Sequence, residues 1–89
     1  MEFLHTDLGH LRRGQVVEAR LRGTEANVLL LDPTGFLSYK NGRQYRYYGG
    51  HFTRSPCHVV VPHAGHWHLV IDMGGFGGRV EAEVSVLAA

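Results

Sequence analysis

Residues Arg79 to Val86, RVEAEVSV in one-letter code, alternate strictly between polar and small apolar side chains. Successive side chains of a β-strand point to opposite faces, so this alternation predicts a strand with one buried and one wet face. His66–Met73 alternates in the same way, apart from Val70, and Gln15–Leu21 repeats the pattern a third time. We therefore expect three strands that each bury one face.

Further strands are expected where apolar and β-branched residues gather between turn signals. In Asn27–Leu31 apolar residues follow one another, so they would point to both faces of a strand. This is typical of a central strand covered on both faces. Cys57–Val61 is short and β-branched, and Gln44–Tyr48 is aromatic and bounded by glycines. Glu2–Leu8 is a weaker candidate. These segments bring the expected number of strands to about seven.

Turn signals separate all of these segments. Pro62–Gly65 joins Cys57–Val61 to His66–Asp72, which suggests a hairpin, and Gly74–Gly78 leads into the last strand. Such closely spaced turns leave room for at most one helical turn, which we place in Phe36–Lys40.

Length and composition indicate one small folded domain. The chain has 89 residues, 44% of them hydrophobic and 19% charged, which is typical of a globular domain too short for two cores. We expect a single all-β domain over residues 1–89, a compact, jelly-roll-like β-sandwich of short antiparallel strands. Its inward positions are expected to be apolar residues at alternate places along the strands: Leu4, Val17, Ala19, Leu21, Val28, Leu30, Val59, Val61, Trp67, Leu69, Ile71, Val80, Ala82, Val84 and Val86.

The sequence favours a cytoplasmic protein. It contains no apolar run of the roughly 18 residues that a membrane-spanning helix needs, and its first 30 residues lack the pattern of a signal peptide. Cys57 is the single cysteine, so an internal disulfide is excluded and nothing points to an oxidising compartment.

Charge is unevenly distributed along the chain. The net charge is +1, but no acidic residue lies between Asp32 and Asp72. This balance argues against bulk nucleic-acid binding and leaves room for one local anionic contact. Aromatic and basic side chains gather in the same segment, where they could stack a base and neutralise a phosphate. The predicted site for an anionic small molecule consists of Tyr39, Lys40, Arg43, Arg46, His51 and Arg54. The alternative is that the tyrosines fill the core and the arginines are solvated.

Histidines form a second group of candidate site residues. His66 and His68 are two residues apart in a predicted strand, so both side chains leave the same face. Such a pair can share a metal ion, with His63 or His58 as a third ligand, and the predicted set is His63, His66 and His68. Asp72 is the nearest acid on that face. The alternative is a pair of solvated histidines on a wet strand face.

Catalysis is not expected. Cys57 and His58 are neighbours in a predicted strand, so their side chains point apart and cannot form a nucleophile and base pair. The leading hypothesis is therefore a non-enzymatic module without a cofactor that binds an anionic small molecule or a protein partner. Two alternatives are a histidine-based metal-binding protein and a structural domain that self-associates through an exposed edge strand.

Several short motifs resemble those of one known family. They are Phe3-Leu4-His5, Asp7-Leu8-Gly9-His10-Leu11, Ala26-Asn27-Val28, Tyr39-Lys40, Gly42-Arg43, Tyr45, Tyr47-Tyr48-Gly49-Gly50, Arg54-Ser55-Pro56, Pro62 and Gly65-His66-Trp67. The chain resembles a small uncharacterised bacterial family, classed as a domain of unknown function and found alone or fused to TIR domains. The resemblance implies a compact all-β domain with no established activity, cofactor or catalytic residue. The TIR fusions imply a ligand-sensing or interaction role.

Overall fold

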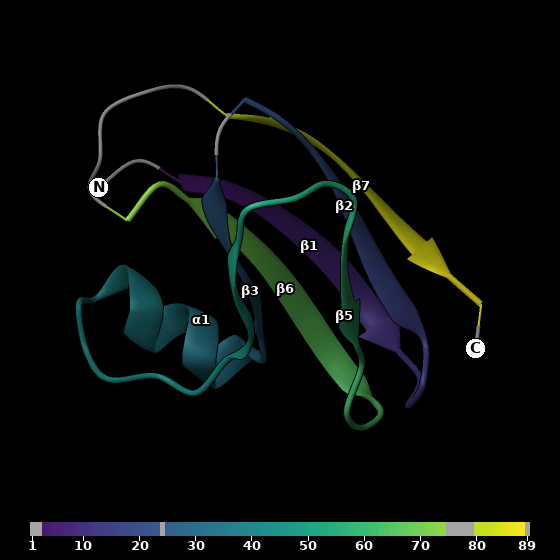
Figure 1. The fold of residues 1–89 in the computed structure, drawn as a ribbon. Coiled ribbons are helices and arrows are strands. Elements are labelled where there is room, and N and C mark those ends of the chain that lie inside the picture. The colour runs from purple at the N-terminus through teal and green to yellow at the C-terminus, as the bar shows by residue number, and fades with distance from the viewer. Residues whose placement is uncertain (1–2, 24, 75–79, 89) are drawn as a thin grey trace.

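Seven strands and one helix make up the part of the chain that this computed structural model describes, residues 3–23, 25–74 and 80–88 (Figure 1). In chain order the elements are β1 (Phe3–Leu11), β2 (Val16–Arg22), β3 (Ala26–Leu31), α1 (Pro33–Lys40), β4 (Tyr48–Phe52), β5 (Cys57–Val60), β6 (Gly65–Asp72) and β7 (Glu81–Leu87). All strand pairings are antiparallel. The prediction of a small all-β domain is confirmed.

The strands form two sheets that stack on each other. One sheet has the order β1-β6-β3-β4 and the other has the order β5-β2-β7. Figure 1 shows α1 on the side of the larger sheet that faces away from the smaller one. β3 and β6 are therefore interior strands with a layer on each side, as the apolar sequence of Asn27–Leu31 predicted.

The main core lies between the sheets. Most of the alternate residues of β2 and β6 that were predicted to point inward are buried there, Val17 and Trp67 among them, and Leu21 is partly buried. Two residues predicted to point inward are exposed to solvent: Leu4 is 42% and Val86 is 37% exposed. Their strands, β1 and β7, are the outermost of their sheets, so these side chains are covered on one flank only.

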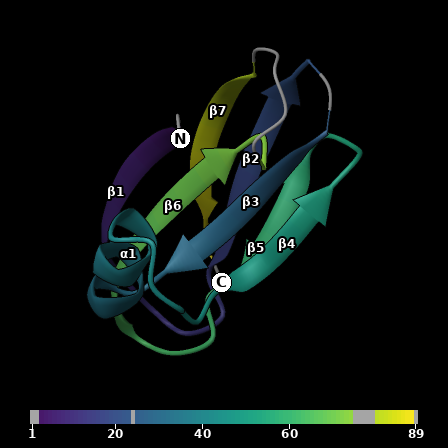
Figure 2. The same ribbon diagram turned by 90° about the vertical axis from the view of Figure 1, so that its left-hand side faces the viewer.

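A second, smaller core lies between α1 and the outer face of the larger sheet. Phe36 and Tyr39 of the helix pack there with Leu29, Leu31 and Val70 of the strands beneath. Figure 2 shows the helix lying in front of that sheet. The helix explains why Val70 breaks the alternation of its strand, since its outward position is covered.

The helix is longer than the single turn predicted for Phe36–Lys40. It has eight residues and starts at Pro33, with the Asp32 carboxylate accepting a 2.6 Å hydrogen bond from the Gly35 N–H. Asp and Pro favour turns, but the same pair also makes an N-cap followed by a proline in the first helical turn. The local sequence supports both structures, and packing on the sheet selects the helix.

The strand predicted at Gln44–Tyr48 is wrong, because β4 starts only at Tyr48. The two glycines interpreted as its boundary, Gly49 and Gly50, lie inside β4 with positive φ angles of 107° and 147°. A side chain at Gly49 would collide with the Val28 carbonyl oxygen, so the strand needs glycine there. The preceding Tyr45 packs edge-on against Tyr39, with ring centroids 5.2 Å apart.

The predicted hairpin is also wrong. β5 pairs with β2 in the smaller sheet, whereas β6 lies between β1 and β3 in the larger one. The turn from Pro62 to Ala64 therefore crosses from one layer to the other. Beyond Gly74, the predicted Gly74–Gly78 connection lies outside the described residues. Within the described part of the chain, no helix is long and apolar enough to cross a membrane.

Candidate metal-binding site

Strands β1 and β6 gather histidine and carboxylate side chains on the outer face of the larger sheet, beside α1. Asp7 of β1 lies directly across from His68 of β6, and His66 leaves the same face two residues away. The Asp7 Oδ1 and His66 Nε2 atoms are 2.7 Å apart. Asp7, His66 and His68 each offer one ligand atom, and these atoms all lie within 4.8 Å of one another.

A bulge in β1 holds the Asp7 carboxylate. The pairing register between β1 and β6 shifts between Asp7 and Gly9, where Gly9 has a φ of 69°. The Gly9 N–H donates a 2.9 Å hydrogen bond to Asp7 Oδ1. This bond, with a further contribution from His66, lowers the pKa of Asp7 below its usual value. Asp7 is therefore kept anionic at neutral pH.

His5 and Phe36 hold the His68 imidazole. His5 Nε2 and His68 Nδ1 are 2.9 Å apart, so one nitrogen of His68 is engaged by His5. The Phe36 ring lies nearly parallel to both imidazoles, with centroid distances of 4.1 Å to His5 and 4.7 Å to His68. Burial, followed by the nearby His5, His66 and Lys40, lowers the pKa of His68. A neutral imidazole in a fixed orientation can act as a metal ligand.

The histidines predicted as ligands do not all meet. His66 and His68 come together, whereas the His63 ring lies against Trp67, with centroids 4.9 Å apart. Trp67 points into the core between the sheets and donates its Nε1–H to the His63 carbonyl oxygen at 3.1 Å. His63 is therefore on the opposite side of β6 from the other two.

Asp72, the acid expected nearest to the histidines, has a different role. It is only 4% exposed and accepts hydrogen bonds from the Tyr39 hydroxyl, the Asn27 side-chain amide and the Gly74 N–H. These bonds tie α1 to β3 and β6. Burial, together with the hydrogen bond to Asp72, raises the pKa of Tyr39.

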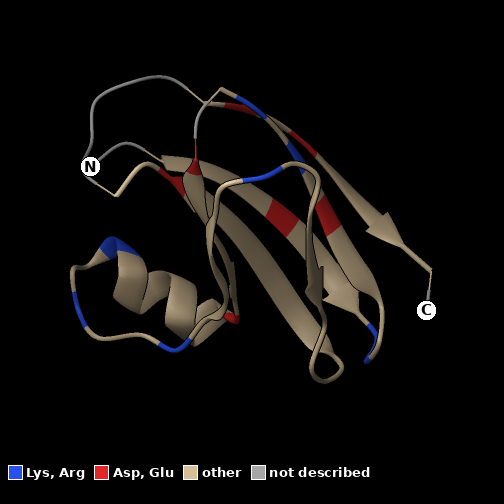
Figure 3. Ribbon diagram, in the orientation of Figure 1, with Lys and Arg blue, Asp and Glu red and all other residues tan. Residues whose placement is uncertain are grey.

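The side chains predicted for an anionic ligand come from four segments of the chain. Two lie at the end of α1, two in the loop that follows, one on β4 and one before β5: Tyr39, Lys40, Arg43, Arg46, His51 and Arg54. Figure 3 shows the basic positions of this set along the helix end and its loop and near the start of β5, with other basic positions on β2. Tyr39 is buried, so its ring is not free to stack on a ligand.

The remaining members of this set have separate surroundings. Lys40 Nζ lies 4.8 Å from the centroid of the Phe36 ring, next to the histidine cluster. His51 contacts Asn27 Oδ1 at 3.1 Å and Glu25 Oε2 at 3.5 Å. A shallow hollow of about 540 Å³ is lined by Gln44, Tyr45 and Arg46, and so includes one member of the set. Among the described residues, the set does not converge on one concave site.

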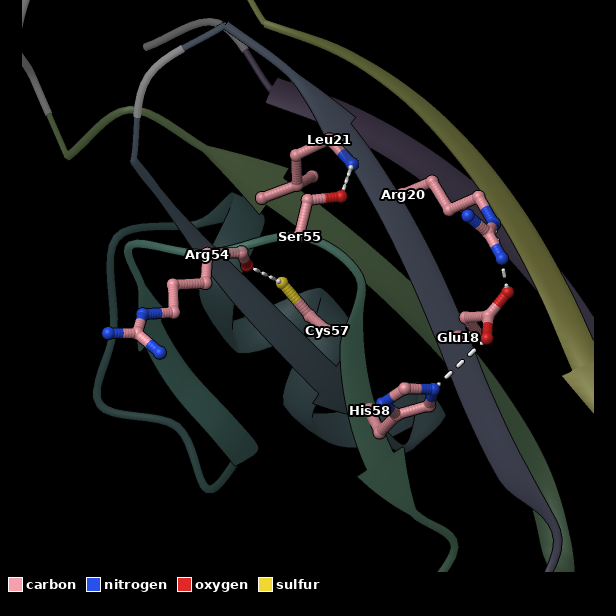
Figure 4. A network of polar contacts seen from close by, with 7 residues as sticks. All are labelled: Glu18, Arg20, Leu21, Arg54, Ser55, Cys57 and His58. Atoms are coloured by element: carbon pink, nitrogen blue, oxygen red, sulfur yellow. Dashed lines mark hydrogen bonds and ion pairs between the residues drawn. The ribbon is translucent and has the colours of Figure 1, made fainter.

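A second polar group lies on the outer face of the smaller sheet (Figure 4). Glu18 contacts His58 Nε2 at 3.0 Å and accepts from Arg20 Nε at 3.2 Å. The hydrogen bond with His58 is the main cause that lowers the pKa of Glu18. The neighbouring Cys57 is buried, which raises the pKa of its thiol, and its Sγ–H donates to the Arg54 carbonyl oxygen. This group offers a metal ion one carboxylate and one imidazole, fewer ligands than the cluster beside α1.

Sequence reasoning missed Asp7, His5 and Phe36 as parts of the cluster. A signal for two of them exists, because His5 and Asp7 are two residues apart within the predicted strand Glu2–Leu8, as His66 and His68 are in theirs. Two such pairs on separate strands meet only if the strands are neighbours in a suitable register. That register is a tertiary property, which no local pattern contains.

The fold and this cluster define a small antiparallel β-sandwich with a histidine and aspartate group on its helix-bearing face. The chain matches the family described as Domain of unknown function (DUF1883) over residues 1–89, and it belongs to that family. The resemblance to an uncharacterised domain family is thereby confirmed. No curated protein and no solved structure matches the chain.

Proposed function

We propose that the chain is a non-enzymatic binding module that holds a divalent transition-metal ion with Asp7, His66 and His68. The observation that carries this proposal is the approach of their three ligand atoms to within 4.8 Å of one another. Two imidazoles and a carboxylate form a ligand set that suits zinc, nickel, copper or cobalt.

The geometry requires only small side-chain movements to accept an ion. Tetrahedral zinc with bonds of about 2.0–2.1 Å separates its ligand atoms by roughly 3.3 Å. The Asp7 Oδ1 and His66 Nε2 atoms, now 2.7 Å apart in a hydrogen bond, would separate slightly to bind the ion. Both side chains are exposed, so an ion can reach them from solvent.

The surroundings of the three ligands support metal binding. His5 engages Nδ1 of His68 and leaves Nε2 for the ion, as an outer partner of a metal-binding histidine does. Phe36 restricts rotation of the imidazoles on the helix side. Three protein ligands leave one position of a tetrahedral ion open, where a water molecule or an anionic partner can bind. The nearby Lys40 favours an anion at that position.

Isothermal titration of untagged, chelator-stripped protein with zinc and nickel chloride tests the proposal. We expect a single ion to bind per chain, and His68→Ala or Asp7→Asn to weaken binding by at least about 10-fold, because each removes a ligand. His63→Ala and His58→Ala are matched controls that remove an imidazole elsewhere and should leave the affinity unchanged. Circular dichroism confirms that each variant folds.

Two results would contradict the proposal. One is a wild-type titration with no more heat than that of a His66→Ala/His68→Ala double variant. The other is a loss of affinity in His63→Ala as large as that in His68→Ala, which would place the ion on the other side of β6.

A further inference from the structure

The hydrogen bonds of β2 show which way the peptide groups of the smaller sheet point. The Leu21 N–H donates to the Ser55 hydroxyl at 2.8 Å (Figure 4), and the Gln15 carbonyl oxygen accepts from the Val61 N–H at 2.8 Å. Both bonds run toward the β5 side of β2. Because peptide groups alternate along a strand, those of the residues between, such as Glu18 and Arg20, point toward β7.

The pairing register between β2 and β7 shows which peptide groups of β7 point toward β2. The residues of β2 that face β7 lie opposite Glu81, Glu83, Ser85 and Leu87, which therefore bond back to β2. The residues between them, Ala82, Val84 and Val86, direct their N–H and C=O groups to the other edge of β7. Among the described residues, no strand pairs with that edge.

The outer strands of the two sheets differ in how well they are guarded against further pairing. β1 has the bulge at Asp7 and Gly9, β4 contains two glycines with positive φ, and β5 has only four residues. β7 pairs with β2 in unbroken register over seven residues and contains no proline, glycine or lysine. Proteins usually blunt edge strands by such devices. β7 is therefore the edge best suited to add another strand.

From this geometry we infer that β7 pairs with β7 of a second copy of the chain, antiparallel and about a two-fold axis at Val84. In this register Val84 faces its symmetry mate and Ala82 faces Val86, so the peptide groups that point outward from the two copies bond to each other. The two smaller sheets then form one continuous sheet.

Charge disfavours the neighbouring register with its axis at Ala82, and an axis at Val86 would pair only Ser85–Leu87 of the two β7 strands. With the axis at Val84, Glu81 lies across from Leu87 of the other copy and Glu83 lies across from Ser85, so that no two glutamates face each other. An axis at Ala82 would place Glu81 opposite Glu83 twice, and like charges directly opposite each other are destabilising. Pairing at Val84 also brings a neighbouring strand beside Val86, whose inward side chain is 37% exposed.

Sedimentation velocity across a range of protein concentrations tests for the dimer. Val86→Pro removes an N–H that points to the free edge and none that bonds to β2, so the dimer should weaken by roughly 10-fold to 100-fold, two hydrogen bonds being lost by symmetry. Val86→Thr is the matched control, since it keeps the branched shape and the N–H and should dimerise as the wild type does.

A pair of charge variants tests the register and does not depend on proline being tolerated. Leu87→Lys and Leu87→Glu remove the same exposed side chain, but only lysine places an opposite charge across from Glu81 of the other copy. We expect the lysine variant to dimerise roughly 10-fold more tightly than the glutamate variant, because two cross-strand pairs change sign.

A protein that remains monomeric at every concentration would overturn the inference. A dimer that is equally strong in Val86→Pro and Val86→Thr, or in the two Leu87 variants, would show that the copies meet elsewhere and would overturn it as well.

Discussion

The two outer faces of the sandwich are built on strands with the same pleat but have different chemistry. On the smaller sheet, the outward residues of the central strand β2 are polar: Arg20 and Arg22 are exposed and Glu18 is partly buried. On the larger sheet, the central strand β3 points Leu29 and Leu31 outward, and α1 covers them. The difference shows that one eight-residue helix is enough to turn an outer face into a second core.

The same helix also positions polar side chains on the outer face of the larger sheet. Phe36 of α1 stacks on the imidazoles of His5 and His68, of which His5 is exposed to solvent and His68 is partly buried. On the bare sheet, Glu18 contacts His58 and Arg20, and among the described residues no aromatic ring stacks on His58. A group of three ligands is thus positioned on the covered face, whereas the linked polar group of the bare face offers one carboxylate and one imidazole.

The largest expected effect on stability comes from comparing a leucine under the helix with a leucine on the bare face. Leu31→Ala should lower the free energy of unfolding by about 2–5 kcal/mol, because it opens a cavity under the helix. Leu87→Ala removes the same atoms from the bare face, where the residue is 41% exposed, and should change stability by no more than about 0.5 kcal/mol. Urea denaturation at low protein concentration measures both. Equal losses would show that the helix does not build a second core.

A smaller effect is expected at the bond between helix and sheet. Tyr39→Phe leaves a buried oxygen of Asp72 without its donor and should cost about 1–3 kcal/mol at neutral pH. The pKa of Tyr39 is raised in the folded protein, so above pH ~10 the unfolded chain loses the phenolic proton first and wild-type stability falls as pH rises. The variant lacks this loss, so the difference between the two proteins should narrow above that pH. A difference that stays constant would contradict the assignment.

The smallest of these effects concerns the start of the helix. Asp32→Ala removes the carboxylate that caps the Gly35 N–H and should cost about 1 kcal/mol. Asp32→Asn keeps an oxygen acceptor at the same place and should be nearly neutral. Chemical denaturation of the two variants gives the comparison. A loss of the same size in both would mean that the charge of Asp32, rather than the cap, stabilises the fold.

Alternation predicted the strands well, because the core between the sheets imposes a period of two on both layers. It failed where a second requirement acts on the same residues. Val70 and Leu31 point outward but are apolar because they pack against α1. Gly49 is a glycine because the Val28 carbonyl group lies too close for a side chain. The short helix itself begins with residues that also favour turns, so tertiary packing decides its structure.

The candidate metal site was predictable only in part. His66 and His68 are neighbours on one strand face, and the alternation of β6 is sufficient to pair them. Asp7 is 59 residues away from His66 and reaches it only because β1 pairs with β6. His63 is closer in sequence but lies on the other side of the strand, since the turn before β6 crosses between the layers. Nearness along the chain was therefore a poor guide to the ligand set.

The most direct test of the metal site is anomalous diffraction from crystals grown with zinc, recorded on both sides of the zinc absorption edge. We predict an anomalous peak on the helix-bearing face at about 2.0–2.2 Å from nitrogens of His66 and His68 and an oxygen of Asp7. Zinc bound at His63 or His58, with the Asp7 cluster free of metal, would contradict the account.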